Sequence, residues 1–78
     1  MDKAIAYVLA IAEKKSITEA AKSLYISQPS LSRYLSSLEK QLGLNLFTRT
    51  VEGTELTEAG KLYVQYSMPE PYNKTIRL

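Results

Sequence analysis

The chain has 78 residues, a formal net charge of +2 and 45% hydrophobic residues, which suffices for one small domain with a modest core. It contains no cysteine and no histidine, which excludes disulfides, thiolate metal ligands and the commonest general base. No apolar run reaches the ~20 residues that span a bilayer, and the start MDKAIAY lacks the layout of a signal peptide. We therefore expect a cytoplasmic protein that is not an enzyme and has no metal, cofactor or membrane partner.

Positive charge is concentrated in the middle of the chain. Residues 14–49 carry six basic and two acidic side chains, a net charge of +4, whereas the segment on either side has a net charge of −1. This distribution has two interpretations: an ordinary solvated surface, or a surface that binds a polyanion. Charge alone favours the first.

Two helices are predicted in the first third of the chain. Residues 2–15 form an alanine-rich segment with apolar side chains at helical spacing. These side chains are Ile5, Val8, Leu9 and Ala12. Ser16 and Thr18 are candidate N-caps for a short second helix over residues 18–25. Its expected inner face consists of Ala20, Ala21 and Leu24.

A third helix is predicted over residues 28–42. Ser27 is a good N-cap, Pro29 falls in the first turn where its missing N–H is harmless, and Gly43 ends the helix. One apolar stripe comprises Leu31, Leu35, Leu38 and Leu42. The opposite face carries small, polar and cationic side chains, namely Pro29, Ser32, Arg33, Ser36, Ser37 and Lys40, and Glu39 lies nearer its flank.

The remaining sequence predicts a small hairpin and a fourth helix. Residues 44–49 and 54–56 are candidate strands around the turn VEG. Thr57 can cap a helix over residues 58–67, which the prolines of MPEP end. The apolar side of this helix is expected to comprise Ala59, Leu62, Tyr63 and Tyr66. Residues 68–78 show no pattern, so we expect a domain over residues 1–67 and an irregular tail.

The second and third helices have the spacing of a helix-turn-helix, which places its second helix in the major groove of DNA. A helix that enters the groove needs small side chains near its backbone and donors for phosphates and base edges. The serines, Gln28 and Arg33 meet that requirement. A three-helix bundle with an ordinary solvated face is the alternative.

Three motifs occur in order: SITEAAKSLYISQPSLSR, LEKQLGLNLFTR and LTEAG. Together they resemble the N-terminal DNA-binding domain of LysR-type transcriptional regulators over about residues 3–67. The resemblance implies a mainly α fold, a winged helix-turn-helix with a three-helix core, a β-hairpin wing and a fourth, linker helix that is shortened here. It also implies a dimer on double-stranded promoter DNA.

The family's base and phosphate contacts fall on Ser27, Gln28, Pro29, Ser32 and Arg33 of this sequence. Thr18 matches a capping position near the phosphates, and Leu31 matches a buried core position. We extend the expected DNA-binding set to Ser30, Ser36, Lys40 and Arg49.

The sequence departs from the family pattern at three places. Lys15 stands where glycine is common, so we expect a less tight turn or another conformation there. Glu52 replaces a cation in the wing, and Arg49 matches a residue at the wing base that can serve structure instead. The fourth helix ends early and no effector domain follows, so we expect no effector site and only a weak homodimer through the fourth and first helices. An interaction module that has lost DNA binding is therefore the alternative function.

Overall fold

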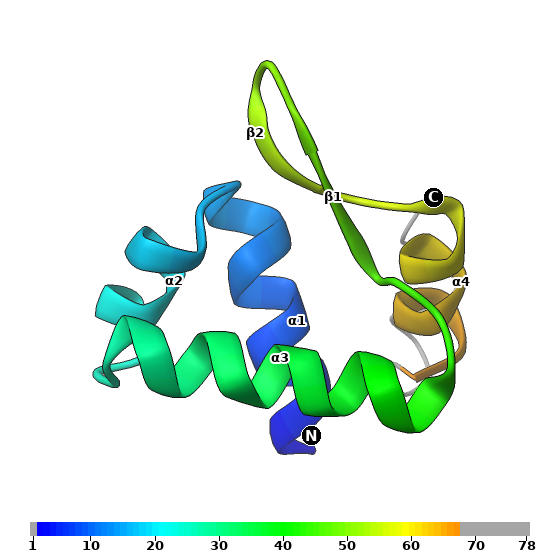
Figure 1. Ribbon diagram of the computed structural model, residues 1–78, viewed down its shortest axis with the longest axis horizontal. Helices are drawn as coiled ribbons and strands as arrows, with labels where there is room; N and C mark the ends of the chain where they lie inside the picture. Colours follow the sequence, from blue (N-terminus) through cyan, green and yellow to red (C-terminus); the bar gives the residue numbers. More distant parts are fainter. Residues whose placement is uncertain (1, 68–78) are drawn as a thin grey trace.

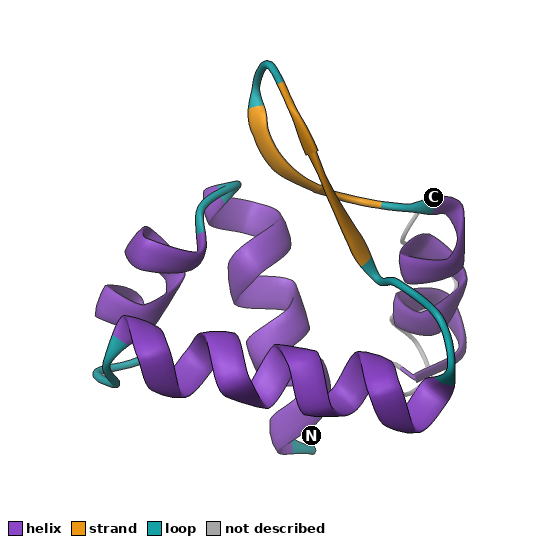
Figure 2. Cartoon of the chain, viewed as in Figure 1, coloured by secondary structure: helices purple, strands orange, loops and turns teal. Residues whose placement is uncertain are grey.

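The structure is a computed structural model that describes residues 2–67 of the 78. Its elements are α1 (Lys3–Lys14), α2 (Ile17–Ser23), α3 (Gln28–Leu42), β1 (Phe47–Thr50), β2 (Gly53–Leu56) and α4 (Glu58–Ser67). α1, α2 and α3 pack together, the hairpin of β1 and β2 projects from them, and α4 lies beside the base of the hairpin (Figures 1 and 2). The predicted mainly α winged helix-turn-helix is confirmed. Within the described part no helix is long and apolar enough to cross a membrane.

α1 is the centre of the core. It contacts α2, α3, α4 and β2, and Ile5, Val8 and Ile11 are almost completely buried. The predicted face included Ile5 and Val8 correctly, but Leu9 and Ala12 are only half-buried and Ile11 was missing from it. The buried residues Ala4, Ile5, Val8 and Ile11 lie on one face of α1, and half-buried side chains flank that face.

The turn after α1 adopts a left-handed conformation at Lys15, with φ 56° and ψ 27°. The expectation of a different conformation at this position was therefore wrong. The amide of Lys15 donates to the carbonyl of Ile11 at 2.8 Å, which closes the end of α1 as a glycine would. A lysine here retains the glycine-type turn at the expense of backbone strain.

α2 begins one residue earlier than predicted and ends two residues earlier. Ser16 is its N-cap and accepts a hydrogen bond from the amide of Glu19 at 3.1 Å, so Thr18 is not a cap but an exposed residue of the first turn. Ala20 and Ala21 are buried as predicted, and Leu24 is half-buried. Tyr25 lies beyond the helix, in a left-handed conformation with φ 60°, and is 95% exposed.

α3 has the predicted bounds. The side chain of Ser27 accepts from the amide of Ser30, Pro29 lies in the first turn, and Gly43 ends the helix with φ 72°. Of the predicted stripe, Leu31 and Leu35 are buried, Leu38 is half-buried, and Leu42 is exposed.

The wing is an antiparallel hairpin in which Phe47 pairs with Leu56 and Arg49 with Thr54. Residues 44–46 are not part of β1, so the predicted first strand began too early. The reason is a contact across seven residues: the amides of Leu46 and Phe47 donate to the carboxylate of Glu39. The Leu46 amide is therefore not available to extend the ladder, although the Leu46 carbonyl still accepts from the Thr57 amide.

α4 has the predicted bounds and the predicted cap, since Thr57 Oγ1 accepts from the amide of Gly60 at 2.9 Å. Its buried residues are Gly60 and Val64, whereas Leu62 is 53% and Tyr66 77% exposed. The predicted apolar side of α4 is therefore largely open to solvent. The predicted irregular tail lies outside the described residues.

Candidate nucleic-acid interface

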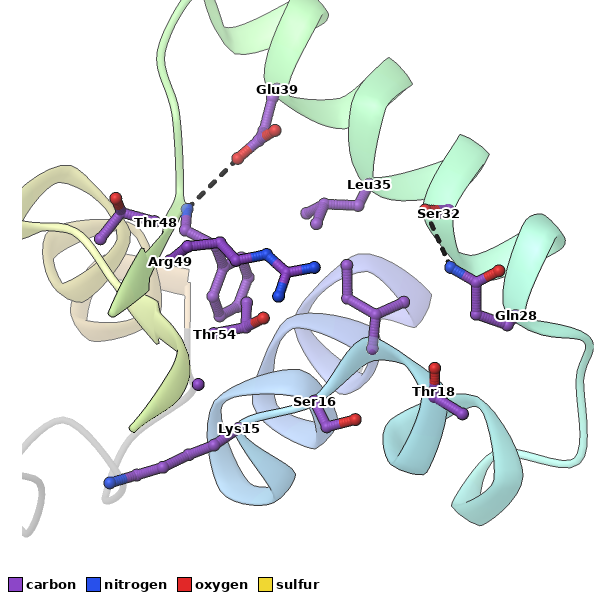
Figure 3. A pocket seen from close by; sticks show the side chains of 13 residues that line it. Lys15, Ser16, Thr18, Gln28, Ser32, Leu35, Glu39, Thr48, Arg49 and Thr54 are labelled. Atoms are coloured by element: carbon purple, nitrogen blue, oxygen red, sulfur yellow. Dashed lines mark hydrogen bonds between the residues drawn. The ribbon is translucent and has the colours of Figure 1, made fainter. Parts of the chain in front are cut away.

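A groove of about 420 Å³ separates the start of α2 and α3 from the wing (Figure 3). Four of the predicted DNA-binding residues line it: Thr18, Gln28, Ser32 and Arg49. The other lining residues are Lys15, Ser16, Ile17, Leu35, Glu39, Phe47, Thr48, Gly53 and Thr54. The fold thus brings the four predicted residues, which lie up to 31 positions apart in the sequence, to one groove.

The first turn of α3 is ordered by a network of serine side chains. Ser27 Oγ accepts from the amide of Ser30 at 3.2 Å and donates to Ser30 Oγ at 2.9 Å. One turn further, Gln28 Nε2 donates to Ser32 Oγ at 3.4 Å (Figure 3). The Gln28–Ser32 bond is long and exposed, so the Gln28 amide can exchange it for a bond to a ligand at little cost.

The outward face of α3 presents the exposed residues Pro29, Arg33, Ser36 and Lys40. Neither Arg33 nor Lys40 forms an ion pair with another described residue. Lysines on other helices form ion pairs: Lys22 pairs with Glu19, and Lys61 pairs with Glu58. Uncompensated positive charge therefore lies on α3, where an anionic ligand can approach it.

Arg49 projects from β1 into the groove (Figure 3). The one carboxylate that lines the groove, on Glu39, is held by the amides of Leu46 at 2.7 Å and Phe47 at 3.2 Å. No ion pair joins Arg49 to Glu39 or to another residue of the described chain. The guanidinium is exposed and keeps its donors available for a ligand.

The tip of the wing differs from the rest of this surface. Val51 and Glu52 form the turn, and both are exposed. The turn is closed by Thr50 Oγ1, which donates to the carbonyl of Gly53 and accepts from the amide of Glu52. The tip thus carries an apolar and an acidic side chain where a phosphate contact would need a donor.

Two residues at this site were not predicted. Glu39 ties the end of α3 to the start of the wing, and the backbone carbonyl of Lys15 accepts from Thr54 at 3.0 Å. Glu39 lies beside the leucine stripe rather than opposite it, a position typical of a side chain that faces a neighbouring element. No sequence signal marks a backbone carbonyl.

Comparison with known proteins assigns the chain to a protein family. A family model described as bacterial regulatory helix-turn-helix protein, lysR family, matches residues 3–61, which include both helices of the helix-turn-helix and the wing. The chain belongs to the lysR family. Its expected resemblance to LysR-type regulators is confirmed.

Two curated relatives and one solved structure illustrate the match. A probable RuBisCO transcriptional regulator of Thalassiosira pseudonana is 52% identical over 58 residues, which are 74% of this chain and 19% of that protein. The HTH-type transcriptional regulator BudR of Klebsiella aerogenes is 46% identical over 59 residues, 76% of this chain and 41% of that protein. The crystal structure of the BenM_DBD/catB site 1 DNA complex superposes with a TM-score of 0.75 at 37% identity, covering 85% of this chain and 75% of that one. The chain therefore spans about a fifth of the first of these curated relatives and about two fifths of the second.

Proposed function

We propose that this chain is the sequence-specific DNA-binding domain of a transcriptional regulator that acts in the cytoplasm, with α3 in the major groove of duplex DNA. The observation that carries the proposal is the outward face of α3, where exposed Arg33 and Lys40 have no acidic partner among the described residues. The similar BenM_DBD structure is a complex with DNA, which supports the same ligand here.

Base recognition is assigned to the first two turns of α3. Gln28 can pair in a bidentate manner with adenine, and Arg33 with guanine or a phosphate. Pro29 can contact a thymine methyl group, and the Ser32 hydroxyl can donate or accept. These side chains share one end of α3, so they would read adjacent base pairs.

Contacts with the DNA backbone are assigned to residues around these base-reading side chains. Thr18, Ser27, Ser30, Ser36 and Lys40 offer hydroxyl or ammonium donors along α2 and α3, and Arg49 offers a guanidinium from the wing. Contacts of this kind fix the position of the protein on DNA without reading sequence. They make binding strongly salt-dependent, because each neutralised phosphate releases counterions.

We also infer a weak homodimer through α4 and α1. The exposed side of α4 forms an apolar groove of about 280 Å³ with the end of α3. Its lining residues are Leu42, Leu44, Ala59, Leu62, Tyr63, Tyr66 and Ser67. An exposed apolar surface with tyrosines at its edge suits a partner helix, and a second copy of α4 supplies one.

An interaction module that has lost specific DNA binding is the second candidate function. The tip of the wing favours it, because Val51 is fully exposed and Glu52 would repel phosphates. In that case the partner would be a protein that contacts the wing rather than α3.

Selection of bound sequences from a random DNA pool, followed by titration at several salt concentrations, tests the proposed function. We expect one enriched motif and an affinity that falls steeply with salt. Lys40→Ala should reduce the salt slope, whereas Lys14→Ala, an exposed lysine at the end of α1, should change it less. Failure to enrich any motif, or weak binding that ignores salt, would favour the interaction module.

A further inference from the structure

The segment Asn45–Phe47, which leads from the end of α3 into the first residue of β1, is hydrogen-bonded to α3 and to the start of α4. From α3, Glu39 Oε2 accepts from the amides of Leu46 at 2.7 Å and Phe47 at 3.2 Å. From the start of α4, Thr57 Oγ1 donates to the carbonyl of Asn45 at 2.6 Å, and the Thr57 amide donates to the carbonyl of Leu46 at 2.9 Å. Three consecutive residues therefore connect α3 and α4 through four hydrogen bonds.

Close packing reinforces these bonds on the α4 side. Gly60 is buried, and a Cβ atom at this position would collide with the carbonyl oxygen of Leu46. The Leu46 side chain is completely buried. Thr57 Oγ1 also accepts from the Gly60 amide, so one hydroxyl serves both the segment and the first turn of α4. A tilt of α4 would break these bonds and push backbone against backbone.

We propose that Glu39, the segment Asn45–Phe47, Thr57 and Gly60 form a rigid joint that fixes the direction of α4 relative to α3. The inference rests on the proposed function: when two chains associate through α4 on DNA, the joint sets the separation of their α3 helices. Glu39, Thr57 and Gly60 are then positioning residues, which select half-site spacing without contacting DNA.

The distance between the two helices tests the joint directly. The chain has no cysteine, so Ser37→Cys on α3 and Ser67→Cys at the end of α4 introduce the only two labelling sites for spin labels. We expect a narrow distance distribution in the otherwise unchanged chain and a broad or shifted one in Thr57→Val, with the helical circular dichroism retained. Thr57→Ser keeps the hydroxyl and should restore the narrow distribution.

A second pair of variants tests the joint independently, in case Thr57→Val fails to fold. Glu39→Ala should also broaden the distribution, because the amides of Leu46 and Phe47 lose their acceptor, whereas Glu13→Ala on the exposed side of α1 should not. Equally narrow distributions in Thr57→Val and Glu39→Ala would overturn the joint.

Measurements of DNA binding test whether the joint sets the preferred spacing of half-sites. Affinity is measured for a single half-site and for pairs of half-sites whose separation varies by single base pairs. Thr57→Val should bind the single half-site with the affinity of the unchanged chain. In the unchanged chain, affinity for a pair at the best spacing should exceed affinity for a single half-site by a factor on the order of 10². In Thr57→Val this factor should fall below about ten. If Thr57→Val lost equal amounts of affinity for single and for paired half-sites, the joint would affect only stability, and its positioning role would be overturned. If the unchanged chain binds no DNA, the proposed function fails, and the label distances still decide whether the joint exists.

Discussion

The amide of Thr54 donates a hydrogen bond of 3.0 Å to the carbonyl of Lys15, which joins β2 of the wing to the turn between α1 and α2. Lys15 adopts a left-handed conformation, and its ammonium lies 3.6 Å from the carboxylate of Glu55. The wing is thus held by a backbone geometry that glycine adopts more readily than lysine.

Replacing Lys15 with glycine should change the free energy of unfolding little, by between about −1 and +1.6 kcal/mol with a central value near zero. An L-residue in the left-handed region costs roughly 1–2 kcal/mol. The exposed Lys15–Glu55 ion pair contributes about 0–1 kcal/mol, and the added freedom of the unfolded chain offsets roughly 0.4–1 kcal/mol. Urea denaturation measures the net change in the free energy of unfolding.

The neighbouring residue supplies the control for this substitution. Lys14→Gly lies inside the last turn of α1 and should lower the free energy of unfolding by about 1 kcal/mol. If Lys15→Gly destabilises the protein as much as Lys14→Gly does, backbone strain at Lys15 is not significant.

Arg33→Ala should weaken binding to the selected DNA site by about 1–3 kcal/mol and relax the preference at one base pair, as the loss of a bidentate contact does. Arg33 is exposed on α3 and forms no ion pair with another described residue, so its removal leaves no buried charge unpaired. Fluorescence anisotropy with the selected site and its single-base variants measures both effects. Lys40→Ala is the matched control and should weaken binding to all DNA sequences alike. If Arg33→Ala binds the selected site with unchanged affinity, Arg33 is not a base-reading residue.

Glu52→Arg should tighten DNA binding, and most of the gain should disappear at high salt. Glu52 lies at the exposed tip of the wing, where an acidic side chain repels phosphates. The comparison is made at low and high ionic strength, with Glu13→Arg on α1 as a control for net charge. Equal affinities of Glu52→Arg and the unchanged chain at low salt would show that the wing tip stays away from DNA.

The helices could be predicted from sequence because their signals are local. Ser27, Pro29 and Gly43 mark the ends of α3 by capping chemistry that depends on a few adjacent residues. The same holds for Thr57 at the start of α4. Thr18 was a weaker case, because Ser16 and Thr18 are both good caps, and Ser16 is the one followed by a glutamate three residues later, the capping-box pattern.

Non-local relations limited the rest of the prediction. The first strand was placed too early because Glu39, seven residues before Leu46, captures the amides that would extend it. The inner side of α4 was misassigned because the close approach of Gly60 to Leu46 turns that side of the helix inward. Most candidate DNA-binding residues lie on α3, but only the folded wing brings Arg49 into one groove with Gln28 and Ser32.

Tyr63→Phe should remove a loss of stability at alkaline pH. Burial raises the pKa of the Tyr63 hydroxyl, the negative charge of Asp2 raises it further, and a hydrogen bond with Ser67 partly lowers it. The folded state therefore holds the proton more tightly than the unfolded chain, in which the tyrosine pKa is about 10. The resulting stability is present below that pH and is lost as pH rises through the folded value.

Urea midpoints at pH 8 and at pH values above 10 test this assignment for Tyr63. The unchanged chain should lose stability relative to Tyr63→Phe between the two pH values, in addition to a pH-independent difference from the lost hydrogen bond with Ser67. Tyr25→Phe, whose side chain is 95% exposed, should follow the unchanged chain. Parallel pH profiles for Tyr63→Phe and Tyr25→Phe would contradict the raised pKa.

Self-association should be weak and should depend on the exposed side of α4. The helix has 10 residues, a length of roughly 15 Å, which limits the apolar area that two copies can bury. We expect monomers at low micromolar concentration, dimers at higher concentration or on DNA, and cooperative binding to two half-sites about one helical turn apart. Sedimentation across a concentration series measures this equilibrium. Leu62→Glu places a charge in the apolar groove and should abolish the dimer, whereas Gln65→Glu, on α4 outside that groove, should preserve it. A dimer that persists in Leu62→Glu, or one that is already complete at nanomolar concentration, would require an interface other than this side of α4.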